Sequence, residues 1–224
     1  NTRRMYVEFE NMMKMMAQSD IEEEEMEETE ESDYDEYNGA FSQTAVENCY
    51  FPKLKKVGGF VFYNCPIRSV NQDNFPVLNE VGRFCFEECP IETLDLPFLK
   101  CIGDSGFSGC IVKSVNLPSL ISINDRGFSH CQSLKSFSAE KLQKIGDYCF
   151  SDCPLLSSIN CNLEPDKFVC NEQNCNECQG CPVCYQDVEV CLQRGKQGGH
   201  AKQEDNDQKE INRVLQRYKV GITV

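Results

Sequence analysis

The strongest constraint on the fold of this chain is an apolar pattern that recurs five times with constant internal spacing. Each copy has a Leu, a Val or Ile three residues later, a Phe after five more and a Cys after another three. The copies begin at Leu54, Leu78, Leu99, Leu120 and Leu142 and end at Cys65, Cys89, Cys110, Cys131 and Cys153, so their start advances by 24, 21, 21 and 22 residues. Self-similarity at a period of about 20–29 residues is typical of a solenoid whose turns stack on their neighbours. The pattern therefore predicts a solenoid, and it favours a binding surface over a catalytic pocket.

Each turn also contains a stretch of alternating side chains after its Cys. Residues 93–96 read Thr-Leu-Asp-Leu and residues 114–117 read Ser-Val-Asn-Leu, which places apolar side chains on one face of a strand and polar ones on the other. We predict one short parallel strand per repeat of about 22 residues. The two apolar residues of Phe-x-x-Cys lie three apart, which predicts short helical or 3₁₀ turns. The segment Leu-x-x-Ile-Gly-Asp is interpreted as an apolar pair that ends in a Gly or Asn turn.

The array begins before its first complete copy. Phe41 is followed by Val46 and Cys49 at the offsets that later copies give to buried residues, and Thr44 takes the position of the Cys. Residues 39–50 are therefore predicted to form a half-turn. The predicted array has about five and a half repeats and covers residues 39–161.

The negative charge of the chain is concentrated outside this array. The net charge is −14, but residues 20–36 carry twelve acids and no base, and subtracting these twelve charges leaves −2 for all other residues. A block of like charge repels itself and cannot bury apolar area, so an acidic disordered tether is predicted over residues 20–38. No basic stripe indicates a nucleic-acid partner, and no run of eighteen apolar residues indicates a membrane span in this chain.

The segments outside the array are short. Residues 1–19 place Met5, Phe9, Met12 and Met16 at helical spacing, which predicts an amphipathic helix that either packs on its own fold or docks a partner. Residues 162–193 are predicted to form a cysteine-rich cap, because a solenoid must cover its last apolar turn. Residues 194–224 are predicted to be a polar linker and a short C-terminal helix.

The cysteines of the cap allow several kinds of chemistry. Cys175, Cys178, Cys181 and Cys184 form three overlapping C-x-x-C pairs, flanked by Cys170 and Cys191. A disulfide-stapled cap is the interpretation that we favour. A zinc site, an iron–sulfur cluster, a redox-active pair and a reduced segment remain alternatives, although structural zinc sites usually separate their two C-x-x-C pairs by more residues.

The repeat motif resembles the BspA-like leucine-rich repeats, which occur in some bacteria and abundantly in protist parasites. The resemblance rests on Phe-x-x-Cys, the alternating strand, Leu-Pro and Leu-x-x-Ile-Gly-Asp-x-x-Phe over residues 39–161. Two departures are three extra residues at 72–74 and the position before each Phe, which the family usually gives to Ala; here it holds Val61, Cys85, Gly106, Gly127 and Cys149. The family is associated with cell-surface adhesion and protein recognition and shares no catalytic residues. The C-x-x-C density is similar to that of cysteine-rich surface proteins of diplomonad protists.

These observations lead us to expect a non-enzymatic recognition protein or scaffold that binds a protein or glycan without a cofactor. The ligand face is predicted to consist of the outward strand residues Ser69, Asn71, Thr93, Asp95, Ser114, Asn116, Ser136, Ser138, Ser158 and Asn160. One alternative is a structural component of a larger intracellular assembly, docked by the acidic tail and terminal helices. A third is a metal or redox protein that uses Cys175, Cys178, Cys181 and Cys184.

The sequence offers little for catalysis. His130 precedes the core residue Cys131, and His200 lies in the predicted linker, whereas a catalytic Cys/His pair needs a thiolate in a polar, partly exposed site. Composition permits phosphate on Ser32 or Tyr34, or sulfate on Tyr34 and Tyr37. The chain begins with Asn, so its lack of a signal peptide does not decide the compartment, and we favour the cell surface or secretion.

Overall fold

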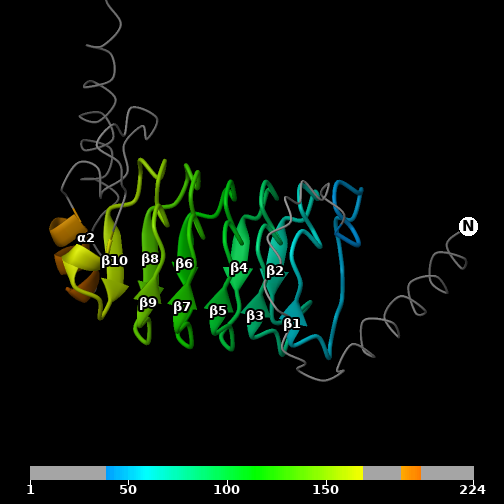
Figure 1. Ribbon diagram of the computed structural model, residues 1–224, viewed down its shortest axis with the longest axis horizontal. Helices are drawn as coiled ribbons and strands as arrows, with labels where there is room; N and C mark the ends of the chain where they lie inside the picture. The colour runs from blue at the N-terminus through cyan, green and yellow to red at the C-terminus, as the bar shows by residue number, and fades with distance from the viewer. Residues whose placement is uncertain (1–38, 169–187, 198–224) are drawn as a thin grey trace, which may run out of the picture. The chain divides into compact units, whose positions relative to one another are not determined.

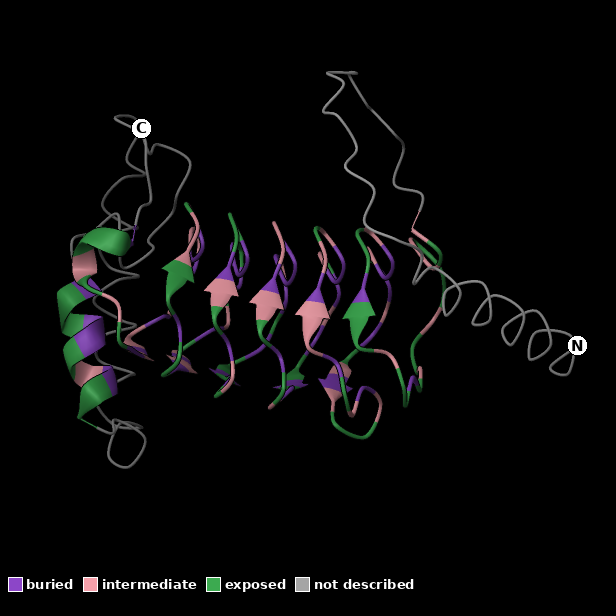
Figure 2. Ribbon diagram, turned by 60° about the horizontal axis from the view of Figure 1, so that its bottom comes forward, coloured by how far each residue is buried: buried purple, intermediate pink, exposed green. Residues whose placement is uncertain are grey.

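The computed structural model describes residues 39–168 and 188–197. The predicted amphipathic helix, acidic tether, four C-x-x-C cysteines and C-terminal helix lie outside these residues. The described part confirms the predicted solenoid, with parallel strands from successive turns lying side by side (Figure 1). Its interior is lined by the buried residues of the repeat (Figure 2).

The strands form parallel ladders along two sides of the coil. The first is a five-stranded sheet of two-residue strands: β1 (Lys56–Val57), β3 (Glu80–Val81), β5 (Cys101–Ile102), β7 (Ser122–Ile123) and β9 (Lys144–Ile145). The other side has a two-stranded sheet of β2 (Ser69–Asn71) and β4 (Thr93–Asp95), and a three-stranded sheet of β6 (Ser114–Asn116), β8 (Ser136–Ala139) and β10 (Ser158–Cys161).

The prediction of one strand per repeat was therefore wrong, because each complete turn contributes two. The second strand comes from the Leu-x-x-Ile segment, where Val81 is buried and Glu80 points outward. Two residues are too few to produce a recognisable alternation in the sequence. The pairing becomes visible only between turns, as in the hydrogen bond from Gly82 N to Val57 O at 2.8 Å.

The Phe-x-x-Cys segments are hydrogen-bonded turns rather than the predicted helical or 3₁₀ turns. Residues two before and two after each Phe have left-handed backbones, with φ of 55° at Phe84 and 58° at Glu88, and this interrupts a right-handed helix. Alternate N–H groups then point to the following turn, where Phe84 N donates to Asp104 O at 2.7 Å and Glu88 N to Ser108 O at 2.9 Å. These turns thus form a third ladder between neighbouring repeats.

A column of stacked phenylalanine rings forms the centre of the core. Neighbouring ring centroids lie 5.2 to 6.4 Å apart with interplanar angles of 5° to 19°. The stack consists of Phe41, Phe62, Phe86, Phe107, Phe128, Phe150 and Phe168. Phe51, Phe75 and Phe137 meet this column edge-on. Eighteen of the twenty residues in the repeating pattern are buried, and the two exceptions, Leu54 and Ile145, belong to its first and last copies.

The C-terminal end of the array is covered by elements that the repeat does not predict. Phe168, directly after the 3₁₀ helix η1 (Pro165–Lys167), stacks on Phe150 with centroids 6.4 Å apart. Helix α2 (Val188–Lys196) packs on β10 (Figure 1), and a side chain at Gly195 would collide with the carbonyl of Ile159. This helix crosses the boundary that we predicted between the cap and the linker at residues 193–194.

We predict that Phe107→Ala lowers the free energy of unfolding by about 3–5 kcal/mol, because it empties the middle of the ring column. Phe98→Ala is the matched control, since Phe98 is 56% exposed and should change stability by less than about 0.5 kcal/mol. Guanidinium denaturation followed by circular dichroism measures both. Equal losses in the two variants would contradict the central role of the column.

Candidate binding face

The ten predicted ligand residues lie on one side of the solenoid, on β2, β4, β6, β8 and β10, and we call them the serine–asparagine face. Strand register arranges them in two columns. One contains Ser69, Thr93, Ser114, Ser136 and Ser158, and the other contains Asn71, Asp95, Asn116, Ser138 and Asn160. Between them the strands bury Val70, Leu94, Val115, Phe137 and Ile159. The predicted alternation of apolar and polar side chains is therefore present on all five strands.

The N-terminal end of this face is occupied by contacts within the molecule. Asn71 Nδ2 donates to Ser69 Oγ at 2.8 Å, and Asn74 Nδ2 donates to the carbonyl of Ser69 at 2.7 Å. The Asn71 side chain also accepts a hydrogen bond from the N–H of Asp73 at 2.8 Å. The three extra residues of the first repeat thus form a loop that engages the polar groups of both face residues.

The C-terminal end is also internally bonded. Asn160 Nδ2 lies 3.2 Å from Ser138 Oγ and 3.3 Å from Glu140 Oε1. Both face residues are only partly exposed. This cross-strand contact joins β8 to β10 and leaves fewer groups at this end for a ligand.

The centre of the face differs from both ends. Thr93, Asp95, Ser114 and Asn116 are exposed, and within residues 39–168 and 188–197 their side chains form no hydrogen bond that competes with a ligand. They lie on β4 and β6, where the strand ladder is interrupted between the two-stranded and three-stranded sheets. The centre therefore offers hydroxyl, amide and carboxylate groups, with Asp95 as its one charged residue.

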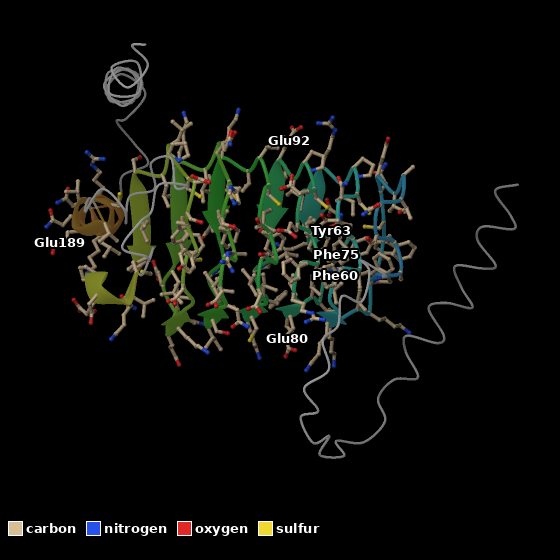
Figure 3. The ribbon with its side chains drawn as sticks, turned by 45° about the horizontal axis from the view of Figure 1, so that its top comes forward. Phe60, Tyr63, Phe75, Glu80, Glu92 and Glu189 are labelled. Atoms are coloured by element: carbon tan, nitrogen blue, oxygen red, sulfur yellow. The ribbon has the colours of Figure 1, made fainter. Side chains whose placement is uncertain are left out.

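Charged residues flank this centre directly before the strands. Arg68 forms an ion pair with Glu92, with Nη1 and Oε1 2.6 Å apart, and Glu92 points away from the coil (Figure 3). Lys113 and Lys135 occupy the same place before β6 and β8 and are exposed. Exposed pairs of this kind add little to stability, so they are available to influence the choice of a ligand.

The repeat cysteines are structural residues of the core. Each thiol donates to the carbonyl of the Phe one turn earlier: Cys89 Sγ lies 3.0 Å from Phe62 O and Cys131 Sγ lies 3.3 Å from Phe107 O. Thr44 occupies the corresponding position in the half-turn, with Oγ1 3.7 Å from Cys65 Sγ. The half-turn therefore has the register that the sequence predicts.

Burial makes these thiols poor nucleophiles. It raises the pKa of Cys89 to about 12 and the pKa of Cys110 and Cys153 well above the ordinary value of 9.0. His130 Nδ1 lies 3.0 Å from Asp152 Oδ2, whereas the thiol of Cys131 points to the Phe107 carbonyl. The chain thus directs the two neighbouring side chains to different partners.

Metal binding is not supported by the part of the chain that the structure describes, where no three His, Cys, Asp or Glu residues are close enough to hold an ion. The zinc alternative at Cys175, Cys178, Cys181 and Cys184 lies outside the described residues, and the expectation of no cofactor stays a prediction. Among the described helices, none is long and apolar enough to cross a bilayer.

Sequence reasoning missed one perturbed carboxyl group. Burial, reinforced by the neighbouring Glu88 carboxylate, raises the pKa of Glu87 to about 7, although a hydrogen bond from Ser108 opposes the rise. Ser108 in turn accepts a hydrogen bond from Ser129 Oγ at 3.0 Å, and both serines are buried. These three residues each follow a core Phe, but the sequence does not show that this position is turned inward.

Comparisons with known proteins address the fold and its class. A family model described as "BspA type Leucine rich repeat region (6 copies)" matches residues 37–101 and 79–172. A solved structure of a leucine-rich cell surface protein from Faecalibacterium prausnitzii shares 20% sequence identity with a TM-score of 0.27. That match covers 50% of this chain and 44% of the bacterial chain, so this chain spans less than half of that protein. No curated protein matches the chain.

The thiol ladder predicts a strong contrast in reactivity between cysteines. Cys101 is partly exposed on the outward side of β5, while Cys89 and Cys131 are buried. Because iodoacetamide reacts with accessible thiolates, Cys101 should be alkylated at least about tenfold faster than Cys89 in the native protein. Peptide mass spectrometry after timed labelling measures this ratio, with the urea-unfolded protein as control. Equal native rates would show that the ladder is not protected.

Glu87 predicts a pH dependence of stability. Its folded pKa of about 7 lies above the ordinary value of 4.5, so its protonated form favours the fold. The contribution is complete below about pH 4.5 and is lost as the pH rises through about 7. We expect Glu87→Gln to reduce the loss of urea stability between pH 5 and pH 8, whereas Glu47→Gln should leave that loss unchanged. An unchanged pH dependence in Glu87→Gln would contradict the assignment.

Proposed function

This chain belongs to the BspA-type leucine-rich repeat family, and we propose that it is a non-enzymatic recognition protein whose serine–asparagine face binds a protein partner. Proteins built from stacked repeats use their extended surfaces for binding. The repeat region accounts for most of the described residues.

The observation that carries the proposal is the contrast between the centre of the face and its surroundings. Main-chain groups along the coil are hydrogen-bonded in the ladders, and the two ends of the face are internally bonded. Thr93, Ser114 and Asn116 instead present exposed polar groups on β4 and β6, each of which is paired with a neighbouring strand on one side. Preorganised groups of this kind bind a ligand with little loss of conformational entropy.

We favour a protein over a glycan because the flanks of the centre are charged. Arg68, Glu92 and Lys113 alternate in sign beside the centre, whose one charged residue is Asp95, and complementary charges at the rim of an interface guide the choice of protein partner. A neutral glycan would make no use of these charges. Binding to an immobilised glycan in preference to any protein would favour the alternative.

We further propose that the protein acts at the cell surface or after secretion, as an adhesion or receptor-type protein. Support comes from the family, which is associated with adhesion. The buried thiols are compatible with an oxidising compartment, because burial shields them from oxidants and raises the pKa of Cys89 and Cys110.

The proposal predicts that a photo-crosslinking residue at Asn116 captures a partner, whereas the same residue at Arg126, an exposed position in the turn before Phe128, does not. Mass spectrometry identifies the captured protein. With that protein purified, Asn116→Arg should weaken binding at least about tenfold, because a large charged side chain cannot fit a matched polar interface. Calorimetry measures the affinity.

The control for folding is the melting temperature, which Asn116→Arg should leave unchanged because the side chain is exposed. Retained binding by Asn116→Arg would overturn the assignment of the face. Deletion of residues 1–37 distinguishes this proposal from the alternative of a structural component. Partner binding is lost in this deletion only if the protein docks through its acidic tail.

A further inference from the structure

A second surface of the solenoid carries most of its lysines, and we call it the lysine face. It surrounds the five-stranded sheet of β1, β3, β5, β7 and β9. The role that we assign to it is additional to the proposed function. Each turn contributes three residues. They are the outward residue of the strand, the residue directly before it, and the residue two positions before that one, at the corner of the turn. The members are Lys53, Lys55 and Lys56; Val77, Asn79 and Glu80; Phe98, Lys100 and Cys101; Ser119, Ile121 and Ser122; and Lys141, Gln143 and Lys144.

The backbone holds these residues in register. The outward strand residues pair in the order Lys56, Glu80, Cys101, Ser122 and Lys144. The carbonyl of Lys55 accepts two hydrogen bonds, from the N–H groups of Asn79 and Glu80, at 2.8 and 3.1 Å. The same pair of hydrogen bonds recurs in the following turns. Both columns are therefore rigid, and their residues lie at fixed spacing along the coil.

Positive charge is concentrated on this face. Six of the nine lysines within residues 39–168 belong to it, and Glu80 is its one acid. Glu80 Oε2 lies 2.9 Å from Lys56 Nζ. In contrast, the described array as a whole has no excess of bases. The lysines of this face gather in its first and last turns, with Lys100 between them.

The middle turns of the same face expose apolar side chains. Phe98 is 56% exposed, Val77 38% and Ile121 36%. These are three of the six large apolar side chains that are exposed among the described residues. An apolar strip between two groups of lysines has no structural role within the coil, since the core is filled on the inner side of the sheet.

We propose that the lysine face binds an extended acidic segment of a partner protein, with acidic residues at both ends and aliphatic or aromatic residues between them. The choice of occupant follows from charge complementarity, because carboxylates match the terminal lysines and apolar side chains match Phe98 and its neighbours. The first and last strands are four strand spacings apart, about 19 Å. An extended peptide covers that distance with roughly six residues.

The segment runs across the strands and does not extend the sheet. β3, β5 and β7 are each paired on both sides, so their main chains have no edge to offer a peptide. The face is also separate from the charged flank of the serine–asparagine face, because Glu80 and Glu92 point away from opposite sides of the coil (Figure 3). The protein can therefore hold two partners, or two parts of one partner, at the same time.

Nucleic acid is the less suitable occupant. Its phosphates form a continuous row of charge, whereas the lysine face interrupts its charges with Val77, Phe98 and Glu80. An oligonucleotide nonetheless tests the charge alone and belongs in the experiment.

The test uses the full chain and a fluorescein-labelled synthetic peptide with the sequence Asp-Glu-Ser-Ser-Leu-Phe-Ser-Ser-Glu-Asp, followed by fluorescence anisotropy at 50 mM salt. We expect saturable binding that Lys100→Glu with Lys141→Glu weakens at least about tenfold, because two attractive charges become repulsive. The matched control is Lys113→Glu with Lys135→Glu, which makes the same change in net charge beside the serine–asparagine face and should weaken binding less than twofold.

A second variant separates the apolar contact from the charge. Phe98→Ser should weaken binding of this peptide several-fold and should not affect a peptide whose Leu-Phe is replaced by Ser-Ser. Circular dichroism melting confirms that each variant is folded. Asn116→Arg should leave peptide binding unchanged, which distinguishes this face from the proposed function.

Four results would overturn the inference. The first is the absence of binding to the intact protein, and the second is an equal loss in the two lysine pairs. The third is tighter binding of a single-stranded oligonucleotide than of the peptide, insensitive to Phe98→Ser, which would assign the face to nucleic acid. The fourth is a dimer in sedimentation that Phe98→Ser dissociates, which would assign the face to a second copy of the chain.

Discussion

Main-chain hydrogen bonds from each turn to its neighbour are the interaction on which the rest of this structure depends. They form ladders along the two strand-bearing sides and in the Phe-x-x-Cys turns, where alternate residues such as Phe84 and Glu88 donate to the following repeat. The left-handed backbone at these residues is what aims their N–H groups at the next turn. Because buried N–H groups need acceptors, a single turn cannot be stable alone, and stacking is a requirement rather than an addition.

The side chains of the core add further contacts between neighbouring turns. The Phe rings stack at the spacing that the ladders impose, and each Cys thiol donates to a Phe carbonyl of the preceding turn. A Val would fill a similar volume but would donate no hydrogen bond to that carbonyl. The Cys column is therefore explained by packing and hydrogen bonding, and the raised pKa values of Cys89 and Cys110 follow from the same burial.

Because every turn repeats the same interior, the outward columns are free to differ in chemistry. The strands β4 and β6 present neutral hydroxyl and amide groups with one carboxylate, while the side of β1 and β9 presents lysines around an apolar strip. Each turn adds one residue to every column, so a substitution changes one surface without disturbing the others. This is why a repeat protein can carry two unlike faces on one scaffold.

The sequence by itself determined the solenoid, the buried residues and the ten outward strand positions, because these depend on periodicity along the chain. It could not reveal the second strand of each turn, which is only two residues long, or the left-handed residues, since bulky side chains such as Phe60 and Phe84 give no local signal for that backbone. It also missed Phe168, which follows Phe150 after eighteen residues, fewer than any repeat. The exposed centre of the serine–asparagine face and the gathering of lysines were likewise decided by the tertiary structure. Hydrogen bonds and charge contacts between turns form only once the turns are stacked. The residue at one position of the chain does not specify which residue lies beside it one repeat away.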